Sequence, residues 1–171
     1  SDALNATVRP TSGRGRLNTI AEALTRIGQE SIDQQNGTDL AKSMAKFSGL
    51  GLREGMLVII SDFFDPHGID AMMAELKRTR HRPLLVAISR PEDREPRLRG
   101  DIRVRDCETG VMRDVTVDST VLENYREAYD KHFDRLRDFA RRRQGGFLDL
   151  NHDKDVMDQL GNLFEGGRYV A

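Results

Sequence analysis

A hydroxyl and two carboxylates follow a short apolar segment of this chain. Residues 56–60 are uninterruptedly apolar and lead directly into Ser61 and Asp62, and Asp65 follows shortly after. Such a run predicts a strand buried on both faces, as in a parallel sheet with helices on either side. In open α/β sheets, ligands bind at the carboxyl ends of the strands. Oxygen atoms at that position could hold a divalent cation or contact a partner.

Other reactive side chains are isolated along the chain. Cys107 lies in a predicted turn without a neighbour that would activate it, which favours an exposed, unremarkable thiol. The four histidines are dispersed, with no pair at metal-ligand spacing. Among them, His132 lies near the apolar stripe of a predicted helix, so we interpret it as a partly buried packing residue.

Two arginine-rich segments could bind anions. Residues 12–16, Ser-Gly-Arg-Gly-Arg, precede a predicted helix and could bring backbone N–H groups to a phosphate. They match neither the P-loop nor the G-x-G-x-x-G pattern, so we interpret them as a basic loop. The arginines of residues 135–143 end a long predicted helix beside aspartates, which is typical of a solvated helix face.

Composition indicates a water-soluble globular protein. The 171 residues are 37% hydrophobic and 32% charged, with a net charge of −1. This length suits one domain with a substantial core. No run approaches the roughly 18 apolar residues of a membrane span, and the charge argues against a globally basic nucleic-acid binder.

The hydrophobic pattern predicts alternating strands and helices. Asp65 is the expected N-cap of the helix after the first apolar strand, and residues 120–123 fit a capping box that opens the longest helix. Residues 90–100 are expected to form an exposed loop. The predicted order is strand 4–9, helices 17–32 and 40–49, strand 56–61, a helix from 65, strand 84–88, a hairpin of 102–105 and 111–117, a long helix stopped by Gly145 and Gly146, strand 147–150, and a final helix from 156. This is an α/β fold with a largely parallel sheet flanked by helices and one inserted β-hairpin.

Several of these segments occur together in an order that resembles a known domain. They are residues 12–16, 37–40, 60–65 and 106–110, followed by the closing strand that carries Asp149. Together they resemble the C-terminal two-thirds of a von Willebrand factor A-like domain, which is Rossmann-like. More narrowly, they resemble the bacterial family called domain of unknown function fifty-eight, which is associated with MoxR-type AAA+ ATPases. The resemblance covers essentially the whole chain.

The resemblance implies a metal-ion-dependent adhesion site that is incomplete. In such domains Mg²⁺ is held by an Asp-x-Ser-x-Ser segment of the first strand, a later Thr, and an Asp after the fourth strand. The matching positions are Thr38 and Asp62, and no Asp-x-Ser-x-Ser occurs in these 171 residues. We therefore expect no cofactor in this chain, with Mg²⁺ bound only if the missing strands are supplied. Ser61 and Asp65 are expected to contact a partner.

The resemblance also implies that residues 1–171 form a single domain that is truncated at its N-terminus and lacks the first strands. Strand 56–61 would then present unpaired N–H and C=O groups, which form a template for pairing with another chain. We expect a homodimer through this edge, a segment swap, or coverage of the edge by residues 1–10.

Three classes of function follow. The favoured one is a non-enzymatic protein-interaction module, an adaptor or scaffold partner of a MoxR-type AAA+ ATPase. It would be cytoplasmic, in a parent protein that membrane helices outside this chain could tether. The alternative is a metal-dependent hydrolase or phosphotransferase centred on Asp62, with Ser61, Asp65 and a third carboxylate from Asp149. A nucleic-acid binder is the third class, and the net charge argues against it.

Overall fold

The centre of the fold is a three-stranded parallel sheet. The computed structural model describes residues 16–31, 39–106 and 110–165. Its strands β1 (Met56–Ser61), β2 (Arg82–Ser89) and β5 (Gly146–Asn151) are parallel and lie in the order β1-β2-β5. The predicted α/β class and the parallel sheet are therefore confirmed. The expected strand 4–9 lies outside the described residues.

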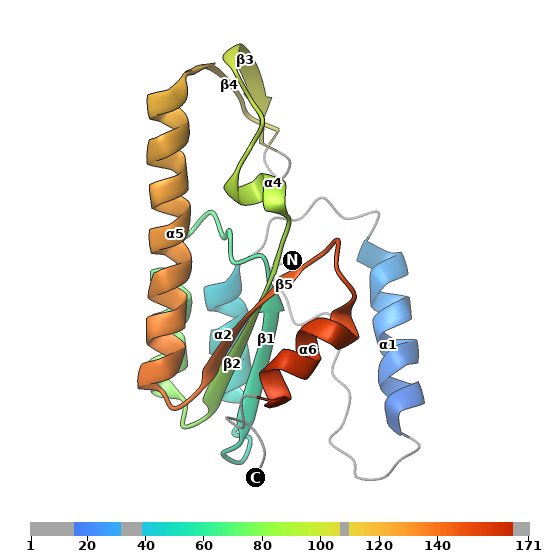
Figure 1. Ribbon diagram of the computed structural model, residues 1–171. Coiled ribbons are helices and arrows are strands. Elements are labelled where there is room, and N and C mark those ends of the chain that lie inside the picture. Colours follow the sequence, from blue (N-terminus) through green and yellow to red (C-terminus); the bar gives the residue numbers. More distant parts are fainter. Residues whose placement is uncertain (1–15, 32–38, 107–109, 166–171) are drawn as a thin grey trace.

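Helices cover both faces of this sheet (Figure 1). On one face, α2 (Leu40–Gly49), α3 (Ile69–Arg78) and α5 (Ser119–Arg142) enclose the core. On the other face, α6 (Val156–Glu165) packs against β5. The main core combines apolar side chains of the sheet with those of α3 and α5: Ile59, Leu85, Ala87, Ile69, Met72, Leu76, Phe133, Leu136 and Phe139. Within the described part of the chain, no helix has the length and apolar character that crossing a membrane requires.

The predicted hairpin is also confirmed. Strands β3 (Gly100–Arg105) and β4 (Met112–Val117) form an antiparallel pair that extends beyond the parallel sheet (Figure 1). The segment before it is not entirely a loop, because Pro91–Arg94 form the short helix α4. At the start of the described chain, α1 (Arg16–Ser31) leaves the apolar side chains of Ile20 and Leu24 exposed.

The prediction that strand 56–61 is buried on both faces is wrong. Its side chains alternate: Ile59 is buried in the core, whereas Met56, Val58 and Ile60 are 48%, 48% and 64% exposed. The physical reason is position, because β1 is an edge strand of the three-stranded sheet and α6 packs on β5 at the other edge. Among the described residues, no element therefore covers this face of β1.

Two predicted helix starts are also wrong. Helix α3 begins at Ile69 after Gly68, whose φ of 77° favours glycine, and Asp65 accepts hydrogen bonds elsewhere. Helix α5 begins at Ser119, and its N-cap is Asp118, whose carboxylate accepts from the Val121 N–H. The helix therefore starts two residues before the predicted capping box, because aspartate is a better N-cap than threonine.

The end of α5 is fixed by a close approach to β2. Gln144 adopts the left-handed conformation with φ 54°, and Gly145 then passes against the backbone of Pro83. A Cβ at Gly145 would lie 1.9 Å from the Pro83 carbonyl oxygen. The glycine pair was expected to stop the helix, and the structure shows that Gly145 is needed for space.

The substitution Gly145→Ala should therefore destabilise the fold. Overpacking of this kind costs about 1–3 kcal/mol or more, because backbone rather than a flexible side chain must move. Gly49→Ala is the matched control, since a Cβ there meets nothing within 4 Å and the helical backbone needs no positive φ. It should be neutral or stabilising by up to about 1 kcal/mol. Urea unfolding of both variants measures the difference, and equal effects would contradict the close approach.

Candidate functional site

The candidate site is formed by the loop after β1, residues 61–67, and the N-terminus of α2. Asp39 is the N-cap of α2: its Oδ1 accepts from the Lys42 N–H at 2.8 Å. Its Oδ2 lies 3.1 Å from the Lys42 ammonium, and its side chain is nearly buried. The hydrogen bond from the Lys42 backbone holds the pKa of Asp39 below its ordinary value. This carboxylate therefore remains ionised and caps the N-terminus of α2.

Asp65 joins the loop to this helix. Its side chain is only 1% exposed, and its Oδ2 accepts from the Leu40 N–H at 2.6 Å. Its Oδ1 accepts from the His67 N–H at 2.7 Å and lies 3.1 Å from His67 Nδ1. The described parts of segments 37–40 and 60–65, which the resemblance singled out, are thus in direct contact.

Ser61 and Asp62 lie at the carboxyl end of β1, as predicted. The Ser61 hydroxyl accepts from the Phe63 N–H at 3.0 Å and donates to Asp62 Oδ1 at 3.4 Å. Asp62 Oδ1 also accepts from the Phe64 N–H at 3.1 Å, and this carboxylate is exposed to solvent. These local bonds fix the direction of Asp62 without covering it. Thr38, the other predicted metal ligand, lies outside the described residues.

A left-handed residue sets the path of this loop. Phe63 has φ 61°, which is uncommon for a bulky side chain, and it is fully buried. The half-buried His132 of α5 donates from Nε2 to the Phe63 carbonyl oxygen at 3.1 Å. The His132 ring also stacks on Phe64, with ring centroids 5.2 Å apart. Burial of Phe63 and the bond from His132 therefore hold the strained backbone that turns Asp62 outward.

The cluster of potential metal ligands differs from the predicted pair. One ligand atom from each of Asp39, Asp65 and His67 can lie within 4.8 Å of the others. These groups do not fit Mg²⁺, which needs a near-octahedral set of oxygen ligands. The carboxylate oxygens already accept from backbone N–H groups or pair with Lys42, and His67 offers nitrogen. The cluster therefore has a structural role: it links the loop after β1 to the N-terminus of α2.

A second polar group lies at the carboxyl ends of β2 and β5. Ser89 donates to Asp149 Oδ1 at 2.6 Å, in a cavity of about 480 Å³ that Tyr129 also lines. Burial, reinforced by the charge of Asp149, raises the pKa of Tyr129 to about 12. Asp149 therefore pairs with Ser89 and is not a member of the cluster around Asp65.

Together these observations describe an α/β domain with a polar, partly exposed loop after strand β1. The chain belongs to the family described as "Protein of unknown function DUF58", which matches residues 1–137. It is 31% identical to the uncharacterized protein MAV169 of Mycobacterium avium over 160 residues, 94% of this chain and 93% of that protein.

Longer relatives match as well. The chain is 28% identical to the uncharacterized proteins Rv1480 of Mycobacterium tuberculosis and Mb1516 of Mycobacterium bovis. Each alignment covers 87% of this chain and 46% of the relative, so the chain spans about half of their length. No solved structure matches significantly.

Removal of the Asp65 carboxylate should destabilise the protein. Asp65→Ala leaves the N–H groups of Leu40 and His67 without their acceptor, at a cost of about 1–3 kcal/mol. Asp153→Ala removes an exposed aspartate at the carboxyl end of β5 and should change stability by less than about 0.5 kcal/mol. Denaturant titration compares the unfolding free energies of the two variants. Equal values would show that the hydrogen bonds of Asp65 to the loop and to α2 do not stabilise the protein.

Stability should also fall with mild acid because of His132. Burial lowers the pKa of His132 below 6.5, so the unfolded chain binds a proton more readily than the folded chain. The contribution is complete above pH 6.5 and is lost as the pH falls from 6.5 toward the folded pKa.

Thermal unfolding at about pH 7.5 and about pH 5.5 measures this effect. His132→Gln keeps a donor for Phe63 and should reduce the pH dependence, whereas the exposed His152→Gln should leave it unchanged. An identical pH dependence in wild type and His132→Gln would contradict this role of His132.

Proposed function

We propose that this chain is a non-enzymatic protein-interaction module that acts as an adaptor or scaffold partner of a MoxR-type AAA+ ATPase. The von Willebrand factor A-like resemblance supplies the class of partner. The observation that carries the proposal is the uncovered face of β1, where Met56, Val58 and Ile60 are exposed beside Asp62. The domain would work in the cytoplasm, in a parent protein that could be tethered to a membrane.

The chemistry of this surface suits a protein partner. Within the described residues, β1 pairs only with β2, so its outer backbone groups are available to an added strand. Apolar side chains next to that edge supply contact area, and the half-exposed Phe64 adds an aromatic group. Asp62 supplies an outward negative charge that a cationic group of the partner could pair with. A second copy of the chain could use the same edge, which would give the homodimer.

A metal-dependent hydrolase or phosphotransferase centred on Asp62 is the second candidate. The exposed carboxylate of Asp62 beside the Ser61 hydroxyl, at the carboxyl end of β1, is the observation in its favour. Binding of Mg²⁺ would require further oxygen ligands, Thr38 among them. Hydrolysis of p-nitrophenyl phosphate that depends on Mg²⁺ and is lost in Asp62→Ala would establish this activity and displace the interaction proposal.

The interaction proposal is tested by capture of a purified MoxR-type ATPase from the same organism on the immobilised chain. Val58→Glu with Ile60→Glu should abolish capture, because charge on the uncovered face prevents apolar contact. Asp62→Ala should weaken capture by about tenfold, the scale of one lost charged hydrogen bond.

Two matched variants serve as controls. Val111→Glu with Met112→Glu places the same charge on two exposed apolar side chains of the hairpin, and Asp153→Ala removes an exposed carboxylate elsewhere. Both should bind like the wild type. Capture that is insensitive to the β1 and Asp62 variants would contradict the proposed surface. Light scattering of the free chain shows whether it forms a homodimer, which would compete with the ATPase for the edge of β1.

A further inference from the structure

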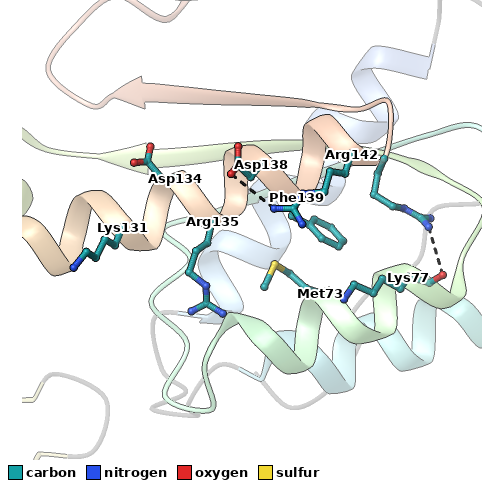
Figure 2. Close-up of a pocket in the computed structure, with 9 residues that line it drawn as sticks. Met73, Lys77, Lys131, Asp134, Arg135, Asp138, Phe139 and Arg142 are labelled. Atoms are coloured by element: carbon teal, nitrogen blue, oxygen red, sulfur yellow. Dashed lines mark hydrogen bonds and ion pairs between the residues drawn. The ribbon is translucent and has the colours of Figure 1, made fainter.

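A groove between α3 and α5 has no role in the proposed interaction through β1. Its volume is about 550 Å³, within the range of ligand-binding clefts. It arises because α3 packs mainly against α2, whereas α5 packs against β2 and β5. The lining combines an apolar floor with charged walls: Met73, Lys77, Lys131, Asp134, Arg135, Asp138, Phe139, Arg142 and Arg143 (Figure 2).

Positive charge dominates these walls. Five lining residues are basic and two are acidic, although the whole chain has a net charge of −1. In Figure 2 the carboxylates of Asp134 and Asp138 point away from α3, while Arg135 points toward it. Asp134 pairs with Arg137, and Asp138 pairs with Arg141 at 2.8 Å. Arginines outside the groove therefore already neutralise its two acidic residues.

Two of the basic groups are available for a ligand. Within the described part of the chain, the Lys77 ammonium makes no ion pair. Arg142 is highly exposed, and its guanidinium lies 3.8 Å from Asp138, a distance at which a surface pair contributes little. These two cations lie on opposite helices, α3 and α5, so together they face a ligand seated between the helices.

The shape of the groove is held by Arg143. Its guanidinium donates to the carbonyl oxygens of Leu76 at 3.2 Å and of Thr79, which ties the end of α5 to the end of α3. Met73 and Phe139 face each other across the floor (Figure 2). The groove is therefore bounded by two packed helices and is not an opening between loops.

We infer that this groove binds an acidic amphipathic helix of a partner protein. Apolar residues at i, i+4 and i+7 of such a helix would lie on Met73 and Phe139, as in other helix-in-groove complexes. Glutamates or aspartates on its flanks would pair with Lys77 and Arg142. The inference rests on the proposed function only in assuming a protein partner, because the exposed side chains of β1 lie on the opposite face of the sheet.

A nucleic acid fits this groove less well than an acidic helix. Binding of a phosphate backbone relies on several cations. The other three basic side chains of this groove already have partners, which leaves Lys77 and Arg142 for a ligand. The floor offers the half-buried thioether of Met73, whereas the ring of Phe139 is only 8% exposed and presents no open aromatic face on which bases could stack. Apolar contact flanked by positive charge matches a protein helix.

The test uses a fluorescein-labelled peptide of about 15 residues, with leucines at i, i+4 and i+7, glutamates on the positions that flank them, and alanines elsewhere to keep it helical. Binding to the full chain is measured by fluorescence anisotropy. The double variant Lys77→Glu, Arg142→Glu should weaken binding by at least about tenfold, because two attractive charges become repulsive. Arg97→Glu, Arg99→Glu makes the same change in charge on an exposed loop and should leave binding unchanged.

Three results would overturn the inference. One is the absence of saturable binding by the helical peptide. Another is equal binding of a scrambled peptide with the same charge, which would show that the groove does not recognise an apolar helix face. The third is tighter, variant-sensitive binding of a single-stranded oligonucleotide. Capture of the ATPase through β1 could persist in each case, so failure here is distinct from failure of the proposed function.

Discussion

The buried carboxylate of Asp65 is the constraint on which the candidate site depends. It accepts hydrogen bonds from the N–H groups of Leu40 and His67, and so joins the start of α2 to the loop after β1. A buried carboxylate that lost these donors would be costly, because it would keep its desolvation penalty without compensation. The loop is therefore held on both sides, by Asp65 toward α2 and by His132 toward α5. Asp62 directly precedes these anchored residues and is directed to solvent.

The edge position of β1 has consequences for function. An edge strand with apolar side chains exposed on one face is an aggregation hazard unless another element covers it. In this chain the uncovered face of Val58 and Ile60 lies next to the fixed loop that presents Asp62. A partner that adds to this edge would bury the apolar face and contact the carboxylate together.

Local pattern was sufficient to predict most of the fold. The apolar run 56–60 indicated a strand, and its order among helices and the hairpin indicated a parallel α/β sheet, which the structure confirms. The pattern could not show that one face of β1 is uncovered, because the same run suits a central strand and an edge strand. Which strand lies at the edge depends on pairings between segments that are distant in sequence.

The site was predictable only in part for the same reason. That Ser61 and Asp62 end a strand follows from their sequence neighbours. Asp65 looked like a helix N-cap, whereas its actual donors include Leu40, which is 25 residues away. His132 was expected to be partly buried, but its bond to Phe63 spans 69 residues. Periodicity and capping rules describe residues a few positions apart, so they cannot predict such contacts.

Hydrogen–deuterium exchange of the chain, with and without the MoxR-type ATPase, shows whether β1 and the Asp62 loop form the interaction surface. We predict slower exchange of backbone amides in residues 56–67 on complex formation, because the partner would cover the β1 edge and the loop that follows it. Exchange in the hairpin strands β3 and β4 should stay the same. Unchanged exchange in residues 56–67, with protection confined to the hairpin, would contradict the claim that β1 and the Asp62 loop form the interaction surface.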